Sequence, residues 1–311
     1  MFPHDRAETA SKPVTVAEIA LHQAADREQV DKGGHMSRPT PFELPKKAKI
    51  AVSFFVALEA FIKYSQYRQG GDKPDYASLA YGEYGGKVGI WRIMDVLNKH
   101  GVKGTIDTNG LAAQKFPDAV RELHKGGHEI VGHGWANDTP LESLDSEKEK
   151  KIIKDTLDSL GSVTGERPIG WVSPGHRITE QTFKFLVEER VIWSGDMPGD
   201  DVPFHQNIDG KPMVIMPRLD YANDLALVFR PKNPPSVYFE SFKTAFDQLY
   251  AEGAAGSPKL VDALVHAHIG GRPNMIGVFD QCIAYAKGFK DVWFCTKGEI
   301  AQWYLERYVS K

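Results

Sequence analysis

Ionisable side chains stand at the ends of three apolar runs in this sequence. Glu59 closes "KIAVSFFVALEA" (49–60), His133 follows "HEIVG" and His266 follows "LVDALV". Carboxylates and imidazoles move protons near neutral pH, and an imidazole can protonate a departing amine. If the runs are neighbouring strands, these three groups predict a site for proton transfer. Other polar residues follow predicted strands in the same way: Asp107, Asn109, Ser173, His176, Asp196, Asp200, Asp201, Arg218, Asp220 and His268.

The elements that would position these residues alternate between strand-like and helix-like segments. "VGIWRIMDVLNKHG" (88–101) has apolar residues at helical spacing and ends at a glycine, and "DSEKEKKIIKDTLDSLGSVTG" opens on the helix caps Asp145 or Ser146. Seven or eight such units predict parallel strands joined by right-handed crossovers. The expected fold class is therefore α/β, a distorted (β/α) barrel of about seven strands, with a doubly wound sheet as the alternative. In such a barrel the site lies at the carboxyl ends of the strands.

The chain divides into two parts by composition. Residues 1–46 are polar and turn-rich, which predicts an N-terminal arm, and residues 47–311 carry the barrel. The segment 62–86 is rich in glycine and tyrosine and is expected to be a long loop with a functional role. Its aromatic rings suit a flat uncharged ring or a sugar.

Composition limits the class of partner. Of the 311 residues 41% are hydrophobic and 25% charged, as in an ordinary globular protein, and the net charge is only -3. No basic stripe indicates nucleic acid or an anionic membrane, so a small-molecule substrate is expected. No signal-like or membrane-spanning window is found, which favours a cytoplasmic location. The two cysteines, Cys282 and Cys295, are expected to be reduced and buried.

Five motifs resemble those of the polysaccharide deacetylase superfamily. They occur in the order of the family and at its spacing, and within it they are most similar to the branch of allantoinases and cyclic imide hydrolases. The likeness covers residues 47–306 and implies a distorted (β/α) barrel and a homo-dimer or homo-tetramer. The motifs are "YGEYGGKVGIWRIMDVLNKHGVKGT", "GHEIVGHGWAND", "GERPIGWVSPGHRITEQT", "SGDMPGDDVPF" and "LVHAHIGGRPNMIGVFDQCIAYAKGFKDVWFCTKGEI".

The sequence departs from this resemblance at the expected metal site. In carbohydrate-acting members the first strand ends in an aspartate base and an aspartate ligand, and two histidines four residues apart complete the site. Here these four places hold Ala57, Glu59, His133 and Asn137. The resemblance implies Glu59, His133 and Asn137 as ligands of a divalent metal, zinc, although a neutral amide is a poorer zinc donor than histidine. Asp107 either replaces the missing base or acts as a helix N-cap partner, and the second role is favoured.

The resemblance also implies roles in catalysis and substrate binding. Glu59 and His133 polarise water, and His266, which precedes "GGRP" and is therefore preferred to His268, protonates the leaving nitrogen. Backbone amides near Gly175 bind the developing oxyanion. The expected substrate-binding residues are Trp135, Trp171, Pro174, Gly175, His176, Asp200, Asp201 and Arg272.

Structural alternatives remain open for several of these residues. A histidine at a strand end can hydrogen-bond neighbouring loops or fill the core. The segment around Gly175 can be an ordinary strand-to-helix turn, and Asn137 and Asp138 can form a turn and a helix cap. Asp200 and Asp201 can form a solvated loop, and Arg272 can brace Asp200.

The expected function is hydrolysis of a non-peptide C–N bond in a small, cyclic amide such as an imide, a ureide or allantoin. Two alternatives stay open. One is a metal-dependent N-deacetylase of amino-sugar glycans, and Ala57 argues against it because loss of a general base typically costs about 10²–10⁴ in rate. The other is a barrel that has lost catalysis and binds a ligand.

Overall fold

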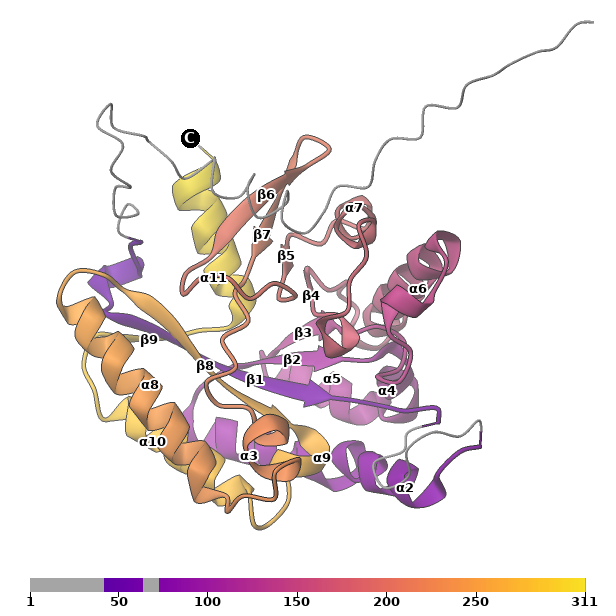
Figure 1. Ribbon diagram of the computed structural model, residues 1–311, viewed down its shortest axis with the longest axis horizontal. Coiled ribbons are helices and arrows are strands. Elements are labelled where there is room, and N and C mark those ends of the chain that lie inside the picture. Colours follow the sequence, from indigo (N-terminus) through magenta and orange to yellow (C-terminus); the bar gives the residue numbers. More distant parts are fainter. Residues whose placement is uncertain (1–41, 64–72, 311) are drawn as a thin grey trace, which may run out of the picture. The chain divides into compact units, whose positions relative to one another are not determined.

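The computed structural model describes residues 42–63 and 73–310. Most of the predicted N-terminal arm, together with Tyr64 and Tyr67 of the predicted loop, lies outside these residues. In the described part, one mixed sheet of nine strands is covered by helices (Figure 1). The strands are β1 (Ile50–Leu58), β2 (Gly104–Thr108), β3 (Glu129–Gly132), β4 (Gly170–Trp171), β5 (Trp193–Ser194), β6 (Phe204–Ile208), β7 (Lys211–Ile215), β8 (Lys259–His266) and β9 (Val292–Phe294).

The helices follow the strands in nearly strict alternation. Helices α8 and α10 pack against each other and cover β8, and α10 also contacts α3 (Figure 1). The α-helices are α2 (Tyr76–Tyr84), α3 (Ile90–His100), α4 (Gly110–Lys115), α5 (Pro117–Lys125), α6 (Ser146–Thr164), α7 (Thr182–Glu188), α8 (Ser236–Ala254), α9 (Ala267–Gly270), α10 (Ile276–Lys287) and α11 (Lys297–Tyr304).

The strand order is β6-β7-β5-β4-β3-β2-β1-β8, and β9 pairs with the first residues of β1. All pairs are parallel except the hairpin β6–β7. Among the described residues, β7 and β8 do not pair with each other. The segment that leaves β7 instead forms a single bridge, Asn223 to Leu264. The distorted (β/α) barrel expected from the sequence is therefore confirmed, with the distortion at this junction.

Strand β1 is buried along its whole length, as expected for a central strand covered on both faces. Its outer face packs with α3, α8 and α10 in one large hydrophobic core. Both cysteines are free and buried, as the sequence predicted. Among the described residues, no helix combines the length and the apolar character that crossing a bilayer requires.

The prediction of one long loop over 62–86 is wrong in its second half. Helix α2 begins after Asp75, whose carboxylate accepts hydrogen bonds from the amides of Ala77 and Ser78. The glycines that suggested a loop serve close packing instead: a Cβ at Gly82 would lie 2.7 Å from the ring of Phe61. The helix thus rests directly on the segment that follows β1.

Candidate active site

Strand register brings the predicted catalytic residues to one edge of the barrel. Ala57 of β1 pairs with Asp107 of β2 on one side and with His266 of β8 on the other. Glu59 lies two residues beyond Ala57, on the same face of the strand. His133 follows the end of β3, and its Nε2 lies 3.7 Å from Glu59 Oε1. The predicted convergence of Glu59, His133 and His266 at the carboxyl ends of the strands is present.

Asn109 ties the strand ends together. Its Oδ1 accepts a hydrogen bond from the amide of Ala60 at 2.8 Å, and its Nδ2 donates to the carbonyl of His133. The amide of Asn137 donates to the carbonyl of Ala60 at 2.9 Å. These bonds fix the backbone beside Glu59 against the backbone that carries His133. Asn109 therefore positions the backbone of the site. The sequence showed only that it is a polar residue that follows a predicted strand.

The imidazole of His133 is held by oxygen atoms at both nitrogens. Nδ1 lies 2.7 Å from the carbonyl of Val172 and 3.2 Å from Asp107 Oδ2, and Nε2 lies 3.1 Å from Asn137 Oδ1. The doubly protonated ring can donate from Nδ1 to Val172 and from Nε2 to Asn137, with Asp107 beside it as a counter-charge. The carboxylate of Asp138 accepts from the amide of Ile62, so this residue anchors the segment after β1 rather than capping a helix.

His266 is paired with an aspartate that sequence reasoning missed. Asp224 Oδ1 lies 2.6 Å from His266 Nδ1, and both carboxylate oxygens accept from the backbone amide of His266. Asp224 is fully buried. This contact leaves Nε2 of His266 as the nitrogen available to a substrate. In the sequence, Asp224 is recognisable only as a carboxylate shortly after a predicted strand. The whole of α8 separates it from His266 along the chain.

The electrostatics of the cluster follow from these contacts. Burial alone would raise the pKa of Glu59, but His266, His133 and His268 outweigh it and lower the pKa to about 2. Burial lowers the pKa of each histidine, yet the carboxylates near His133 and His266 raise both pKa values to about 9. For His268 burial prevails, and its pKa falls to about 4. At neutral pH the site thus holds an anionic Glu59 and two imidazolium groups.

Asp107 lies inside this cluster. It is 2% exposed, and burial raises its pKa even though His133 and His266 act in the opposite direction. The favoured prediction that Asp107 is an N-cap partner is wrong: the N-cap of α4 is Asn109, and no side chain makes a cap hydrogen bond there. The residue instead faces His133.

The loop after β4 forms one wall of the site. Gly134 has a φ of +63° and a Cβ there would lie 2.8 Å from Pro174, so glycine allows the two loops to touch. The carboxylate of Asp196 accepts hydrogen bonds from the amide and hydroxyl of Ser173. His176 Nδ1 lies 3.6 Å from Asp196 Oδ1. Gly175, at φ +63°, is exposed at the tip of this turn.

Two predicted aromatic walls differ in exposure. Trp135 is half-buried, and its ring packs over Gly110, where a Cβ would lie 2.7 Å away. Trp171 has no exposed surface and packs in the core with Leu157 and Leu186. Because the Trp171 ring is packed into this hydrophobic core, the prediction that it forms a wall of the substrate site is wrong. Its indole N–H donates to Ser173 Oγ instead.

Asp200 and Asp201 do not join the catalytic edge. The carbonyl of Asp201 accepts from the amide of Leu260, at the start of β8, whereas His266 ends that strand. Six residues of extended chain separate these points by about 20 Å. Asp200 Oδ1 accepts from the amides of Asp201 and Val202, which is a turn contact. The expectation that this pair binds substrate beside His266 is therefore corrected.

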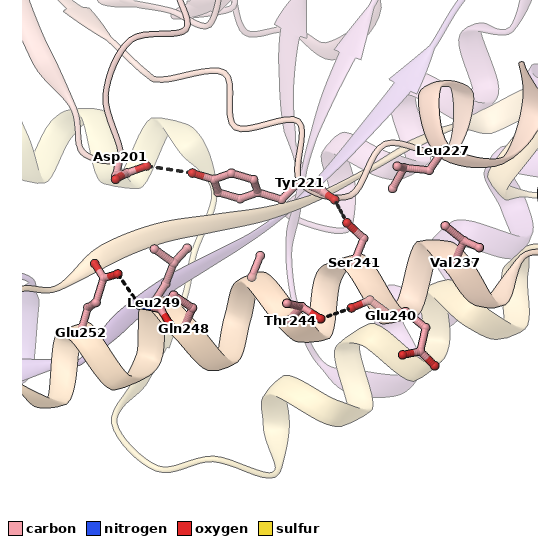
Figure 2. Close-up of a pocket in the computed structure, with 11 residues that line it drawn as sticks. Asp201, Tyr221, Leu227, Val237, Glu240, Ser241, Thr244, Gln248, Leu249 and Glu252 are labelled. Carbon is pink, nitrogen blue, oxygen red and sulfur yellow. Dashed lines mark hydrogen bonds between the residues drawn. The ribbon is translucent and has the colours of Figure 1, made fainter. Parts of the chain in front are cut away.

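Asp201 belongs to a different cavity, of about 680 Å³. Figure 2 shows its carboxylate bonded to the hydroxyl of Tyr221, above the exposed side of α8. The lining mixes apolar side chains of α8 with Glu240 and Glu252, and it contains no histidine. This cavity therefore lacks the groups that the proposed chemistry needs.

Arg272 packs on two tyrosine rings of α2. Its guanidinium lies 3.8 Å from the ring centre of Tyr81 and 4.2 Å from that of Tyr84, and its Nε donates to the carbonyl of His268 at 2.8 Å. Cation–π stacking of this kind joins α2 to the turn after β8. The contact of Arg272 with a substrate stays a prediction.

The described residues do not fit a tight zinc site. No group of three or more histidine, cysteine, aspartate or glutamate residues is arranged for a metal within the described ranges. Of the predicted ligands, Asn137 is a neutral amide that already contacts His133 Nε2, the nitrogen that would bind the ion. A divalent ion stays a candidate, but no step below depends on one.

Comparison with known proteins gives a consistent result. A family model described as polysaccharide deacetylase matches residues 70–188. A putative polysaccharide deacetylase of Schizosaccharomyces pombe is 27% identical over 248 residues, which are 74% of this chain and 76% of that protein.

Two solved structures have the same fold over almost their whole length. One, titled Puue allantoinase, is 28% identical with a TM-score of 0.81, and the match covers 90% of this chain and 98% of the other. The second, a probable polysaccharide deacetylase from Pseudomonas aeruginosa PAO1, is 26% identical with a TM-score of 0.80, over 90% and 99% of the two chains.

Proposed function

We propose, from the premise that this chain belongs to the polysaccharide deacetylase superfamily and is a hydrolase of non-peptide C–N bonds, that its substrate is a small cyclic amide. An imide, a ureide or an allantoin-like ring is the class intended. The observation that carries the proposal is the buried cluster in which Glu59, His133 and an aspartate-held His266 meet.

The chemistry follows from the charges of the cluster. Glu59 and His133 polarise a water molecule that attacks the ring carbonyl. The backbone amide of Gly175 stabilises the oxyanion, because a hydrogen-bond donor aimed at developing charge lowers the barrier. His266, cationic at neutral pH, then protonates the departing nitrogen through Nε2 while Asp224 holds its Nδ1.

A small ring suits the enclosure of the site. Glu59, His133 and His266 are each less than a tenth exposed, and Tyr81 of α2 packs on His268 in the turn after β8. A neutral ring needs no counter-charge beyond the paired ions already present. The likeness to the structure titled allantoinase supports the same class of substrate.

Turnover of a panel of ring amides tests the proposal. Purified protein is assayed with allantoin, succinimide, dihydrouracil and hydantoin, and with N-acetylglucosamine oligomers in parallel. We expect ring opening of at least one amide and no release of acetate. Acetate release without any ring opening would reject the proposal.

The second candidate is N-deacetylation of amino-sugar glycans. It is favoured by the name of the Schizosaccharomyces pombe relative and by the family model. This activity would require about one tightly bound zinc ion per chain and would be lost on chelation. Elemental analysis and a chelator treatment therefore separate the two candidates. For the cyclic amidase we expect substoichiometric zinc, because Asn137 replaces a histidine donor.

The remaining features of the protein are also proposals. We propose a cytoplasmic homo-dimer or homo-tetramer in which residues 1–46 form an arm and residues 47–311 form the catalytic barrel. Light scattering, cell fractionation and the activity of a chain that begins at residue 42 test these points one by one.

A further inference from the structure

One carboxylate oxygen in the buried cluster has no hydrogen-bond partner. Asp107 Oδ2 lies 3.2 Å from His133 Nδ1, while Oδ1 is buried and makes no hydrogen bond to any described residue. Buried polar atoms are nearly always paired, and an unpaired carboxylate oxygen is particularly costly. Folding gives no reason for this arrangement, so the oxygen is expected to bind a group that comes from outside the chain.

The register of the sheet shows where this oxygen lies. Asp107, Ala57 and His266 occupy one row across β2, β1 and β8. Residues in register on parallel strands point to the same face, so the side chains of Asp107 and His266 flank the methyl group of Ala57. The residue at the centre of the row, Ala57, has a smaller side chain than either of its neighbours.

The other carboxylate of the cluster is already engaged on both sides. Glu59 Oε1 lies 3.7 Å from His133 Nε2, and Oε2 lies 3.6 Å from His268 Nδ1. Glu59 is therefore placed to hold imidazole rings, whereas Asp107 has one oxygen for the histidine and one to spare. The two carboxylates differ in role because they differ in contacts.

We propose that Asp107 is a catalytic base whose Oδ1 binds the attacking water and takes its proton. The inference rests on the proposed function in that it requires hydrolysis at this site, but not on the ring nature of the amide. Oδ2 lies against His133, which leaves Oδ1 as the oxygen that a water molecule would contact.

The step balances as a hydrolysis. An O–H bond of water breaks, its proton goes to Asp107 Oδ1, and the water oxygen forms a bond to the carbonyl carbon. The C=O π pair moves to the oxygen and returns when the C–N bond breaks, and the nitrogen keeps that bonding pair and receives a proton from His266. Asp107 then releases its proton to solvent and His266 takes one up, so the net reaction consumes one water.

Asp107→Asn tests the assignment, because it keeps the shape and removes the proton acceptor. We expect kcat to fall by about 10²–10⁴ with KM changed by less than about threefold. Circular dichroism and thermal melting show whether the variant folds. Asp107→Glu is the second variant: it keeps a carboxylate, displaces its oxygens and is also expected to lower kcat. Asp262→Asn, at a buried aspartate elsewhere on β8, is the matched control that should lower the melting temperature and leave kcat near wild type.

Restoring activity with a carboxylate at a second position tests whether Asp107 is a base or has only a structural role. Ala57→Asp combined with Asp107→Asn returns a carboxylate to the adjacent position of the same row. We expect the double variant to be at least about tenfold faster than Asp107→Asn, since a base contributes through its position rather than its strand of origin. A structural role for Asp107 predicts no such recovery.

The outcomes distinguish this inference from the proposed function. If wild type opens no ring amide but releases acetate from the glycan oligomers, the cyclic-amide proposal fails and the variants are measured on the glycan. The inference itself is overturned if folded Asp107→Asn and Asp107→Glu keep kcat near the wild-type value, or if the double variant is no faster than Asp107→Asn.

Discussion

The barrel interior holds two buried polar groups of residues that behave differently. The carboxyl-edge cluster comprises Glu59, Asp107, His133 and His266, and the inner layer comprises Thr105, Glu129, Asp262 and Lys297, which lie earlier on the same strands or at the start of α11. All of these residues are buried except Glu129, which is half-buried. Burial of ionisable groups therefore does not by itself mark an active site in this protein.

The inner layer is fully satisfied. Lys297 Nζ donates to Asp262 Oδ2 at 2.7 Å, and its backbone amide donates to Thr105 Oγ1. Glu129 accepts from Thr105 Oγ1, the amide of Gly298 and the indole of Trp193. None of the layer's side-chain atoms is among the unpaired buried atoms of the described residues. Such a closed network stabilises one packing of the interior.

The carboxyl-edge cluster is left incomplete by comparison. The contact between His133 and Glu59 is 3.7 Å long, and Asp107 Oδ1 has no hydrogen-bond partner among the described residues. Its histidine pKa values are raised to about 9. Strongly shifted groups with unused hydrogen-bonding capacity are typical of sites that bind and transform a ligand. The two groups contain similar residue types. They differ in whether all of their buried polar atoms have hydrogen-bond partners.

The largest expected effect comes from His266→Gln. Removal of the proton donor should lower kcat/KM by about 10²–10⁴ and leave the fold intact. The matched control is His128→Gln, because His128 is also buried but only accepts a hydrogen bond from the amide of Gly104. Steady-state kinetics on the best ring amide measures both. Equal losses in the two variants would contradict the division between the regions.

Lys297→Met should produce the opposite pattern in the inner layer. It leaves Asp262 as an unpaired buried carboxylate, which costs about 3–5 kcal/mol of unfolding free energy. We expect the melting temperature to fall by about 10 °C while kcat of the folded protein changes little. Calorimetry together with kinetics below the transition checks this.

Addition of Asp262→Leu to Lys297→Met tests the reason for that loss. Replacing both charges by apolar side chains removes the unpaired ion, so stability should recover in part. A double variant as unstable as the single one would show that Lys297 contributes through packing on Phe55 rather than through the ion pair.

The sequence predicted the barrel and the three convergent residues because these depend on local signals. Alternating runs mark strands, and the carboxyl ends of parallel strands meet at one edge. Asp224 could not be found in this way, since its contact with His266 depends on how the segment after β7 crosses β8. A missed local signal was "IDGK", in which Asp209 and Gly210 form the tight turn of the β6–β7 hairpin.

The family resemblance led to wrong positions for some residues, because the order of motifs does not show how deeply a residue is buried or where along a strand it lies. Trp171 and Asp201 occur in the expected motifs, yet one is in the core and the other is at the far end of β8. Asp107 was assigned to a cap because strand-end carboxylates often precede helices, but the register with Ala57 turns it inward. Side-chain direction in a strand depends on register, which a single sequence does not reveal.

Alkaline pH should affect the carboxyl-edge cluster first. Because the pKa of His266 is raised to about 9, the donor is protonated at neutral pH, and kcat/KM should fall above pH 9 by about tenfold per unit. The same shift means that His266 stabilises the folded state fully below its unfolded pKa of 6.5, and that this contribution is lost as pH rises to about 9. A pH profile that stays level to pH 10 would contradict the assignment.

The smallest effect is expected at Asp201. Asp201→Asn weakens the hydrogen bond from Tyr221, which should lower the free energy of unfolding by about 1 kcal/mol. Since Asp201 lies about 20 Å from His266 along β8, kcat/KM should change by less than about twofold. Tyr221→Phe is the matched control, because it removes the same bond from the other side and should have the same two consequences. If Asp201→Asn alone raised KM by about tenfold or more, Asp201 would be a substrate contact after all, and the active site would have to extend across the opening between β7 and β8.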